Sequence, residues 1–328
     1  MRDVAALSGV SAKTVSRVFN EDPHVLPETR ARVQASLRQL NYIPNALARN
    51  FRTGTAPSIG IAVPDIEDPF FAAVIKSVDR IAATRDLSTV VTNIGLEPHR
   101  EPELVDSLLR RQLGGLIIAP VSRDHSFLRL WLQRVPTVFV DRMPGGIAAD
   151  SFTDDDGGGG YLATAHLIEH GHRRIAFVGD SSELQTEVGR LKGYRKALVA
   201  HDIHFEAALV AFGAKDRDGA ALALSSVRSA RPTAVFASNA RTSIALVPAL
   251  RGTGLALVGF GDFPMADMLT PSVTVIDQDP SELGALAAQR LLDRLDRPQG
   301  RFRRRTVLPV RLVERESCRV AAASSLSP

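Results

Sequence analysis

From Ser58 onward, short apolar runs alternate with longer amphipathic stretches along the chain. The apolar runs are typical of buried parallel strands, and the amphipathic stretches are typical of the helices that cover them. The expected strands span residues 58–63, 89–91, 116–119, 137–140, 175–179, 209–212, 234–237 and 256–260. The expected helices lie near residues 72–84, 101–112, 160–170, 190–200, 219–228 and 243–251. This alternation predicts an α/β body with parallel sheets, and its length favours two similar lobes over a single core.

The first 20 residues predict two short helices joined by a tight turn. Gly9 suits the backbone of such a turn, and Ser11 is a good N-cap for a second helix over about 12–20. The first helix carries Val4, Ala5 and Leu7, and the inner face of the second consists of Val15, Val18 and Phe19. Lys13 and Arg17 are left facing outward. Two short helices in this arrangement predict a helix-turn-helix.

A third helix is expected to begin at Pro27, because proline is favoured at the first helical position and Glu28 suits a helix N-terminus. Its apolar positions are Val33, Leu37 and Leu40. We therefore expect a small three-helix core in the first 44 residues.

A short helix is expected to follow, with Asn45 as its cap and Gly54 at its end. Leu47 and Phe51 lie one turn apart on this helix, and arginines flank them. Such a stripe has two interpretations. It is either a linker packed on the body or a helix that orders on DNA and inserts an apolar side chain into the minor groove.

The composition is that of an ordinary globular protein. Of 328 residues, 45% are hydrophobic and 23% are charged. No apolar run is long enough for a transmembrane helix, and the N-terminus does not follow the pattern of a secretory signal. The one cysteine, Cys318, excludes an internal disulfide and a multi-cysteine metal site. We therefore expect a soluble cytoplasmic protein without membrane contact.

The net charge of +4 is concentrated at the N-terminus. Residues 1–55 contain 8 basic and 4 acidic residues, whereas the rest of the chain is balanced. Such asymmetry favours a head that binds a polyanion, attached to a neutral body, although a solvated basic face is also common.

Short motifs along the whole chain resemble those of one protein family. In the head they are Asp3-Val4-Ala5, Gly9-Val10-Ser11, Thr14-Val15-Ser16-Arg17-Val18, Asn20, His24-Val25, Thr29-Arg30 and Leu40-Asn41-Tyr42-Ile43-Pro44-Asn45. In the body they are Pro64-Asp65-Ile66, Pro69-Phe70-Phe71, His166-Leu167, Gly171-His172-Arg173-Arg174-Ile175, Gly259-Phe260 and Leu308-Pro309. With these motifs the chain resembles the LacI/GalR (lactose-repressor) family of bacterial transcription regulators.

The resemblance implies an all-α helix-turn-helix head and an α/β two-lobed body that is similar to the periplasmic binding proteins. We expect a DNA-binding domain at residues 1–44, a hinge helix or linker at 45–55, and an effector-binding and dimerisation domain at 56–328. The implied function is a sequence-specific transcriptional regulator, a repressor, that an effector controls allosterically. The expected partners are a pseudo-palindromic operator in double-stranded DNA, a small sugar-like effector and a second copy of the chain. The alternative is a sugar-binding receptor without a regulatory role.

A recognition helix places its first residues in the major groove, which predicts roles for the head. The side chains expected to face base edges are Ala12, Lys13 and Arg17. Those expected to contact the DNA backbone are Ser11, Thr14, Ser16, Asn20, His24, Tyr42 and Asn45. Leu47 and Phe51 are expected to enter the minor groove.

Ligands of parallel sheets bind beyond the carboxyl ends of the strands, so polar residues there are candidates for the effector site. Each alone is more commonly a helix cap, but several converge by topology at positions where the family contacts its effector. The candidates are Asp65, Phe70, Phe71, Asp141, Arg190, Lys215, Asn239, Asp262 and Gln278. One of the two phenylalanine rings is expected to stack on the ligand and the other to pack in the core.

Three positions depart from the family pattern in this region. Ala240 and Gly261 stand where members carry aspartates, and Lys215 stands where an aromatic ring often stacks on the ligand. If all three line the cleft, an acidic effector such as a sugar acid or sugar phosphate is favoured. The alternatives are a neutral-sugar site with Lys215 in solvent, or a degenerate pocket.

No sequence motif indicates a phosphate-binding loop or a metalloprotease site. Residues 157–160 are four glycines before a helix, but they lack the phosphate-loop ending and are interpreted as a flexible helix start. His166, His170 and His172 are close in sequence, yet no metalloprotease glutamate accompanies them, and a structural role is favoured over a metal site. We expect no cofactor, no metal and no enzymatic activity.

Overall fold

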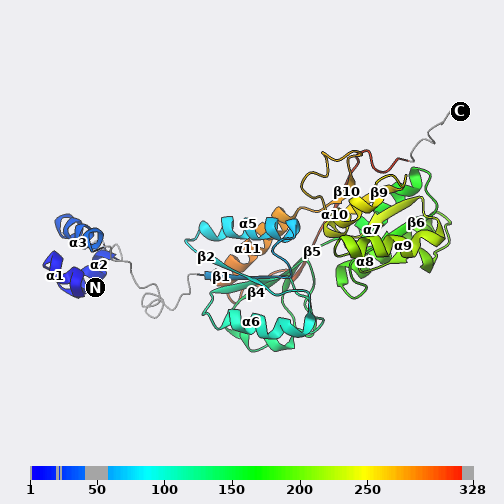
Figure 1. Ribbon diagram of the computed structural model, residues 1–328. Helices are drawn as coiled ribbons and strands as arrows, with labels where there is room; N and C mark the ends of the chain where they lie inside the picture. Colours follow the sequence, from blue (N-terminus) through cyan, green and yellow to red (C-terminus); the bar gives the residue numbers. More distant parts are fainter. Residues whose placement is uncertain (1, 20–21, 23, 41–57, 320–328) are drawn as a thin grey trace. The chain divides into compact units, whose positions relative to one another are not determined.

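The computed structural model describes residues 2–19, 22, 24–40 and 58–319. The chain divides into two compact units, Met1–Thr55 and Ala56–Pro328, which we call the head and the body (Figure 1). The expected hinge segment at 45–55 lies outside the described residues.

The head contains three helices, α1 (Arg2–Ser8), α2 (Ala12–Phe19) and α3 (Pro27–Gln39). Gly9, between the first two, has a φ of +67°, a backbone conformation that glycine adopts without strain. The core of the head consists of Val4, Ala5, Val15, Val18, Val25 and Val33. The expected core position of Leu40 is wrong, because this residue follows the end of α3 and is 42% exposed.

The first lobe of the body is built on a six-stranded parallel sheet of order β11-β5-β4-β3-β1-β2. Its strands are β1 (Ser58–Val63), β2 (Ser88–Asn93), β3 (Gly115–Ile118), β4 (Thr137–Val140), β5 (Asp150–Asp154) and β11 (Arg305–Leu308). Its helices are α5 (Pro69–Ala83), α6 (Glu101–Leu109) and α11 (Pro280–Asp296). In Figure 1, α5 and α11 cover one face of this sheet and α6 covers the other.

The second lobe repeats this plan with the order β12-β10-β9-β8-β6-β7, in which only the β10–β12 pair is antiparallel. Its strands are β6 (Ile175–Val178), β7 (Val210–Ala211), β8 (Ala234–Ala237), β9 (Ala256–Phe260), β10 (Thr274–Asp277) and β12 (Arg311–Val313). Its helices are α7 (Asp156–Glu169), α8 (Gln185–Ala200), α9 (Arg217–Val227) and α10 (Ala240–Leu250). Short 3-10 helices lie at Pro98–Arg100, Ser126–Leu128, Trp131–Gln133, Ala207–Leu209 and Arg228–Ala230.

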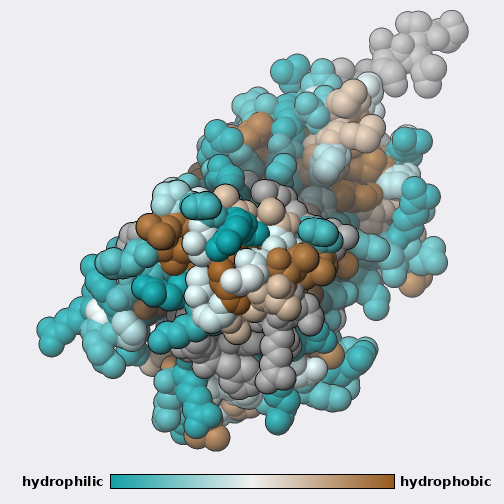
Figure 2. All heavy atoms as spheres, turned by 90° about the vertical axis from the view of Figure 1, so that its left-hand side faces the viewer, coloured by the Kyte–Doolittle hydropathy of each residue, from teal (hydrophilic) through white to brown (hydrophobic). Residues whose placement is uncertain are grey.

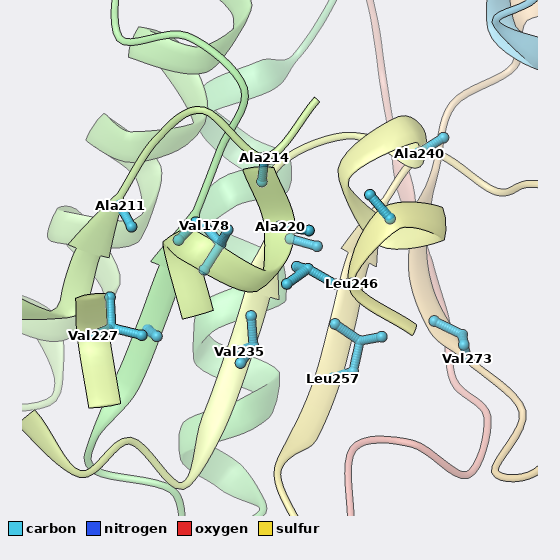
Figure 3. Close-up of a cluster of buried hydrophobic side chains, with 14 of the residues drawn as sticks. Val178, Ala211, Ala214, Ala220, Val227, Val235, Ala240, Leu246, Leu257 and Val273 are labelled. Carbon is cyan, nitrogen blue, oxygen red and sulfur yellow. The ribbon is translucent and has the colours of Figure 1, made fainter. Parts of the chain in front are cut away.

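Each sheet buries an apolar layer on both faces. In the second lobe, α9 and α10 pack Ala220, Val227 and Leu246 against Val235 and Leu257 of the sheet (Figure 3). The opposite layer lies under α7 and α8. Because both faces are covered, the central strands are continuous apolar runs, which is why the sequence pattern identifies β1, β4, β8 and β9 with their observed bounds.

The chain crosses between the lobes three times. The crossings follow β5, β10 and β11, so that α11 and β11 return to the first lobe late in the sequence. The sequence pattern does not predict β5, β10, β11, β12 or α11. Of these strands, β11 and β12 are short and mostly exposed or half-buried, and they lie at sheet edges, where the apolar signal is weak.

The four glycines at 157–160 belong to the first turns of α7, as the expected helix start. Gly160 faces the backbone of α8, where an added Cβ would lie 2.3 Å from the carbonyl oxygen of Arg190. A Cβ added at Gly193 of α8 would lie 2.2 Å from the carbonyl oxygen of Gly157. The glycines therefore allow the backbones of α7 and α8 to approach each other.

Among the described residues, none of the helices combines the length and apolar character needed to cross a bilayer. The space-filling view in Figure 2 shows a mostly hydrophilic surface with hydrophobic residues scattered over it.

Candidate functional site

The second helix of the head presents polar side chains to solvent. Ser11 begins α2 as its N-cap, and its hydroxyl accepts a hydrogen bond from the backbone N–H of Thr14 at 3.1 Å. Ala12, Lys13 and Arg17 are exposed, whereas Val15 and Val18 of the same helix are buried. The exposed face therefore has the composition that a recognition helix needs in a DNA groove.

Asp22 holds two of the expected DNA-contacting side chains after α2. The Nε atom of Arg17 donates to Asp22 at 2.8 Å, and Nδ1 of His24 lies 3.1 Å from the other carboxylate oxygen. These contacts hold the pKa of Asp22 well below its usual range, chiefly through Arg17. Asp22 thus orients the Arg17 side chain through its Nε.

The remaining expected contacts in the head are not all described. Asn20, Tyr42, Asn45, Leu47 and Phe51 lie outside the described residues, and only the helical backbone of Ser16 is described.

In the body, both sheets contain a point where the strand order reverses. In the first sheet β1 lies between β2 and β3, and in the second β6 lies between β7 and β8, so the strand order reverses at β1 and at β6. The crevice at such a reversal is where open parallel sheets bind ligands. Asp65 follows β1, whereas Asp180 follows β6 and Asn239 follows β8.

A cavity between the lobes collects these strand ends, and we call it the cleft. It is lined by Pro64, Asp65, Asp68, Phe70, Phe71, Leu96, Asp141, Arg142, Asp180, Leu184, Thr186, Glu187, Arg190, Asn239, Ala240, Arg241 and Gln278. Among the charged lining side chains, five are carboxylates and three are guanidinium groups. Acceptors and donors therefore occur together, with an excess of negative charge.

Arg190 is fixed by the protein at the base of the cleft. It is 4% exposed, its Nε donates to Asp156 at 2.8 Å, and another of its nitrogens donates to the carbonyl of Ser238 at 2.7 Å. Its guanidinium carbon lies 3.8 Å from the centre of the Phe260 ring. Burial acts to lower the pKa of Arg190, but the charges of Asp156 and Glu187 raise it more, so the group stays charged.

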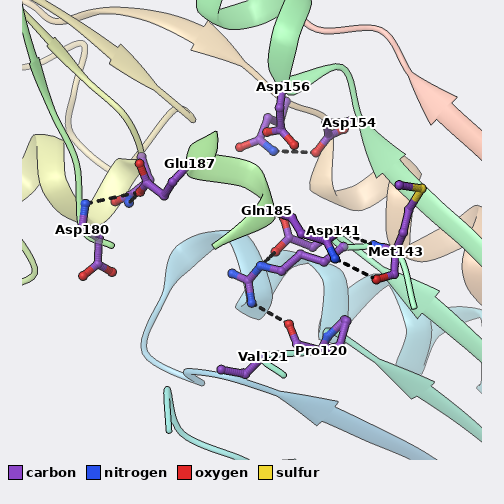
Figure 4. A network of polar contacts seen from close by, with 12 residues as sticks. Pro120, Val121, Asp141, Met143, Asp154, Asp156, Asp180, Gln185 and Glu187 are labelled. Carbon is purple, nitrogen blue, oxygen red and sulfur yellow. Dashed lines mark hydrogen bonds and ion pairs between the residues drawn. The ribbon is translucent and has the colours of Figure 1, made fainter. Parts of the chain in front are cut away.

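Glu187 is the central acceptor on α8. It is 1% exposed, and its Oε1 accepts a hydrogen bond from the side-chain amide of Asn239 at 2.7 Å. Its Oε2 has no hydrogen-bond partner among the described residues. Burial raises the pKa of Glu187, and Arg190 opposes that rise. Figure 4 shows Glu187 and Asp180 in the second lobe, together with Asp141, Met143 and Gln185 of the same polar network.

Asn239 has two structural contacts in this network. Its side-chain oxygen caps α10 by accepting from the backbone of Thr242 at 2.8 Å, while its amide nitrogen holds Glu187. Asn239 therefore lines the cleft as the residue that orients Glu187.

Polar contacts join the two lobes across the cleft. Arg241, at the start of α10, pairs with Asp65 of the first lobe at 3.4 Å and with Asp180 of its own lobe. Gln185 and Met143 exchange two hydrogen bonds, of 3.2 and 3.3 Å, between a side-chain amide and a backbone (Figure 4). These contacts hold the lobes in the described arrangement.

The side-chain amide of Gln278 donates a hydrogen bond to Asp154. Asp154 ends β5 and Gln278 follows β10, so the contact lies where the chain crosses between the lobes. Asp154 is 6% exposed, and burial raises its pKa to about 6. The proximity of Asp141 contributes to this rise.

The two phenylalanines lie at the start of α5 and both line the cleft. Their rings meet edge to face, with centroids 5.2 Å apart. Phe71 is 5% exposed and belongs to the core of the first lobe, whereas Phe70 is only partly buried against that core. Phe70 is thus the ring that remains available to a ligand.

Two expected effector residues lie elsewhere. Lys215 is exposed and is not among the residues that line the cleft. Asp262 is also absent from the lining, and its carboxylate forms a two-pronged ion pair with Arg315 at 2.6 and 3.0 Å. The cation that suggested an acidic effector is therefore not part of the cleft.

The other two positions that depart from the family pattern lie together at the cleft. Ala240 lines the cleft, and a Cβ added at Gly261 would lie 3.4 Å from the Cβ of Ala240.

Several lining residues were not anticipated from the sequence. Asp180 follows a strand as Asp65 does, so the same signal identifies it. Asp68 is the N-cap of α5, and burial raises the pKa of its carboxyl. Glu187 and Arg241 lie on helices, where no strand-end signal marks them.

The comparisons with known proteins cover both units. Residues 1–45 match the family model described as bacterial regulatory proteins, lacI family, and residues 164–318 match the periplasmic binding protein-like domain. The ribose operon repressor of Escherichia coli (strain K12) is 32% identical over 97% of this chain and 99% of its own length. The chain belongs to the lacI family. The expected resemblance is thereby confirmed, and the chain is a DNA-binding transcriptional regulator of that family.

Solved structures of lacI-family regulators share the fold. The Lac repressor dimer bound to operator and the anti-inducer ONPF superposes with a TM-score of 0.84 at 27% identity, covering 97% of this chain and 98% of that one. A complex of the regulator CelR with cellobiose gives a TM-score of 0.71 at 29% identity, covering 96% and 98%. The expected fold, a helix-turn-helix head with a two-lobed α/β body, is confirmed. The family consists of regulators rather than enzymes, and the alternative of a receptor without a regulatory role is not supported.

Proposed function

We propose that this regulator represses transcription by binding an operator through its head, and that a neutral, polyhydroxylated small molecule in the cleft controls this binding. The ribose operon repressor and the cellobiose complex are the relatives that support a sugar-like effector. The two sites are then coupled reciprocally. If the effector changes the affinity of the protein for the operator by some factor, the operator changes the affinity for the effector by the same factor.

The observation that carries the effector class is the mixture of donors and acceptors in the cleft. The buried Oε2 of Glu187 and the Nε of Arg241 both lack a hydrogen-bond partner among the described residues. A hydroxyl group donates to one and accepts from the other, so a polyol satisfies both kinds of group. Phe70 adds an apolar surface for a sugar face.

The charge of the cleft argues against an acidic ligand. Carboxylates outnumber guanidinium groups in the lining, and Arg190 is already paired with Asp156. An anionic ligand would be repelled by this excess of negative charge. The guanidinium of Arg190 would also be unavailable to it, because Asp156 already binds this group.

Calorimetric titration of matched ligands tests the effector class. The set contains a pentose, a hexose, the uronate of that hexose and its phosphate. We expect a neutral sugar to bind and the charged relatives of the same sugar to bind at least about tenfold more weakly, which corresponds to about 1.4 kcal/mol. Tighter binding of the uronate or the phosphate would contradict the proposal for the cleft.

For DNA, we propose that α2 enters the major groove. Ala12, Lys13 and Arg17 face base edges, while Ser11 and Thr14 at the start of the helix contact the backbone. Ser16, Asn20, His24, Tyr42 and Asn45 are proposed as further backbone contacts. Leu47 and Phe51 are proposed to enter the minor groove. Selection from random DNA should yield a pseudo-palindromic site, and selection of a single unrepeated half-site would contradict this proposal.

We propose further that the chain acts as a homodimer in the cytoplasm, where the operator is found. One small head contacts only a few base pairs, and two-fold symmetry doubles these contacts. Light scattering with and without operator tests the assembly, and a monomer on DNA would contradict it.

A further inference from the structure

Four potential metal ligands meet in the second lobe, away from the residues that line the cleft. His166 lies on α7 and His170 directly follows that helix, while Glu314 follows β12 and Cys318 comes four residues later. One ligand atom of each residue lies within 4.8 Å of all the others. The sequence places the two histidines on one helix, but only the fold brings the carboxylate and the thiol to them.

The spacing of these atoms fits a tetrahedral ion. The Sγ of Cys318 lies 3.7 Å from Nε2 of His170, and that nitrogen lies 3.7 Å from Oε1 of Glu314. Zinc binds sulfur at about 2.3 Å and histidine nitrogen or carboxylate oxygen at about 2.0–2.2 Å. In a tetrahedron these bonds place neighbouring ligand atoms roughly 3.3–3.6 Å apart. The two printed His170 distances exceed this range by only a few tenths of an ångström, and every other pair of ligand atoms lies within 4.8 Å.

His166 provides an independent indication of a bound ion. Its side chain is 5% exposed, and its Nε2 has no hydrogen-bond partner among the described residues. A buried polar atom without a partner is costly in a folded protein, and a metal ion would satisfy this nitrogen.

The second histidine is oriented by the helix that precedes it. Nδ1 of His170 lies 2.9 Å from the carbonyl oxygen of His166, so this nitrogen carries the proton and donates it. The tautomer leaves Nε2 as a lone-pair donor on the side of Cys318 and Glu314. Metal-binding histidines commonly have such a contact at the other ring nitrogen.

His172, the third histidine in this stretch, supports the cysteine from behind. Its ring nitrogens lie 3.0 Å from the Thr233 hydroxyl and 3.3 Å from the carbonyl oxygen of Cys318. His172 is therefore not a ligand but fixes the backbone that carries the thiol.

We propose that His166, His170, Glu314 and Cys318 form a structural Zn²⁺ site that ties the end of α7 to the segment after β12. Two neutral imidazoles, one thiolate and one carboxylate balance the charge of a divalent ion, which suits a largely buried position. Four protein ligands close the coordination shell, as in structural zinc sites.

The test uses the full-length protein without an affinity tag. After removal of metals, it is dialysed against Zn²⁺ in the presence of a competing chelator, and bound zinc is measured by mass spectrometry. We expect one ion per chain and a raised unfolding temperature, because the ion binds only the folded form. Replacement by Co²⁺ should give the visible spectrum of a tetrahedral ion and a sulfur-to-cobalt charge-transfer band.

Variants distinguish this site from adventitious binding. Cys318→Ser and His166→Gln should weaken zinc binding by at least about 100-fold, since outer-shell partners alone contribute about 10–100-fold. Cys318→Ser should also abolish the charge-transfer band. Glu314→Gln changes an exposed side chain, so it tests a ligand with little risk to folding, and weaker zinc binding is expected.

His99→Gln is the matched control, because His99 is an exposed histidine of the first lobe, and it should leave zinc binding unchanged. Wild-type protein that holds substantially less than one ion per chain would overturn the proposal. Equal zinc affinity in wild type, Cys318→Ser and Glu314→Gln would overturn it as well. Neither result bears on operator or sugar binding, so the proposed function stands or fails separately.

Discussion

Arg241 and Asp65 form an ion pair across the cleft, with the guanidinium of the second lobe 3.4 Å from the carboxylate of the first. Both side chains are about three-quarters shielded from solvent, with exposed fractions of 24% and 28%. The same guanidinium pairs with Asp180 in its own lobe. One cation thus connects a carboxylate that follows β1 with another that follows β6.

This pair should be measurable in a double-mutant cycle of Arg241→Gln and Asp65→Asn. We expect a coupling energy of about 0.5–1 kcal/mol in urea unfolding, because the pair is partly shielded from solvent. The control is the ion pair of Arg85 with Asp296, whose side chains are about half exposed and whose coupling should be smaller. A coupling across the cleft no larger than that of the control would show that the interlobe pair contributes nothing to the described arrangement.

Stability should depend on pH through Asp154. Its pKa is raised by burial from the ordinary value of 3.8 to about 6, so between these pH values the folded chain binds more protons than the unfolded chain. The free energy of unfolding therefore falls as pH rises through this window, by roughly 2–3 kcal/mol from this group. Asp154→Asn removes the titration. The difference in stability between the variant and wild type should grow in favour of the variant from pH 4.5 to 7, and a constant difference would refute this.

The close approach of α7 and α8 makes opposite predictions for two neighbouring glycines. At Gly160 an added methyl group would lie 2.3 Å from the carbonyl of Arg190, so Gly160→Ala should destabilise the body by about 1–3 kcal/mol or more. At Gly157 the nearest atoms to an added methyl lie 3.9 Å away, so Gly157→Ala should be neutral or stabilise the helix by up to about 1 kcal/mol. Equal effects of the two substitutions in thermal unfolding would show that the glycines do not set the spacing.

On DNA, Arg17→Ala should cost about 1–3 kcal/mol of operator affinity and relax the preference at one base pair. The terminal nitrogens of Arg17 suit guanine O6 and N7, while Asp22 holds the Nε. Fluorescence anisotropy with operator and with random DNA provides the measurement and its control. If both affinities fell equally, Arg17 would contact phosphate and not a base.

The buried strands could be predicted because they are apolar on both faces. Thr137–Val140 and Ala234–Ala237, for example, have every residue buried, and a continuous apolar run indicates such a strand. Asp150–Asp154 is also fully buried, but its Asp-Ser-Phe-Thr-Asp sequence is mostly polar and gives no such signal. Arg294 satisfies Asp150 there with two hydrogen bonds, a contact that spans 144 residues of sequence.

The residues that line the cleft also divide into those that the sequence indicates and those that it does not. The strand-end rule indicates Asp65, Asp141 and Gln278 because it depends only on local sequence and on the direction of parallel strands. It fails for Asp262, which a distant arginine, Arg315, binds instead. It also cannot indicate Glu187, because the burial of that side chain depends on how α8 meets Asn239 of another segment.

The late return of α11 and β11 to the first lobe has a consequence for synthesis of the chain. A ribosome completes the three helices of the head by Gln39, whereas the first sheet lacks its edge strand until Leu308 has been made. Domains fold during synthesis once their residues have emerged. A nonsense mutation between Leu40 and Pro280 would therefore leave a complete helix-turn-helix on a body that can finish neither lobe. Such a product would be able to bind DNA but not to respond to a ligand.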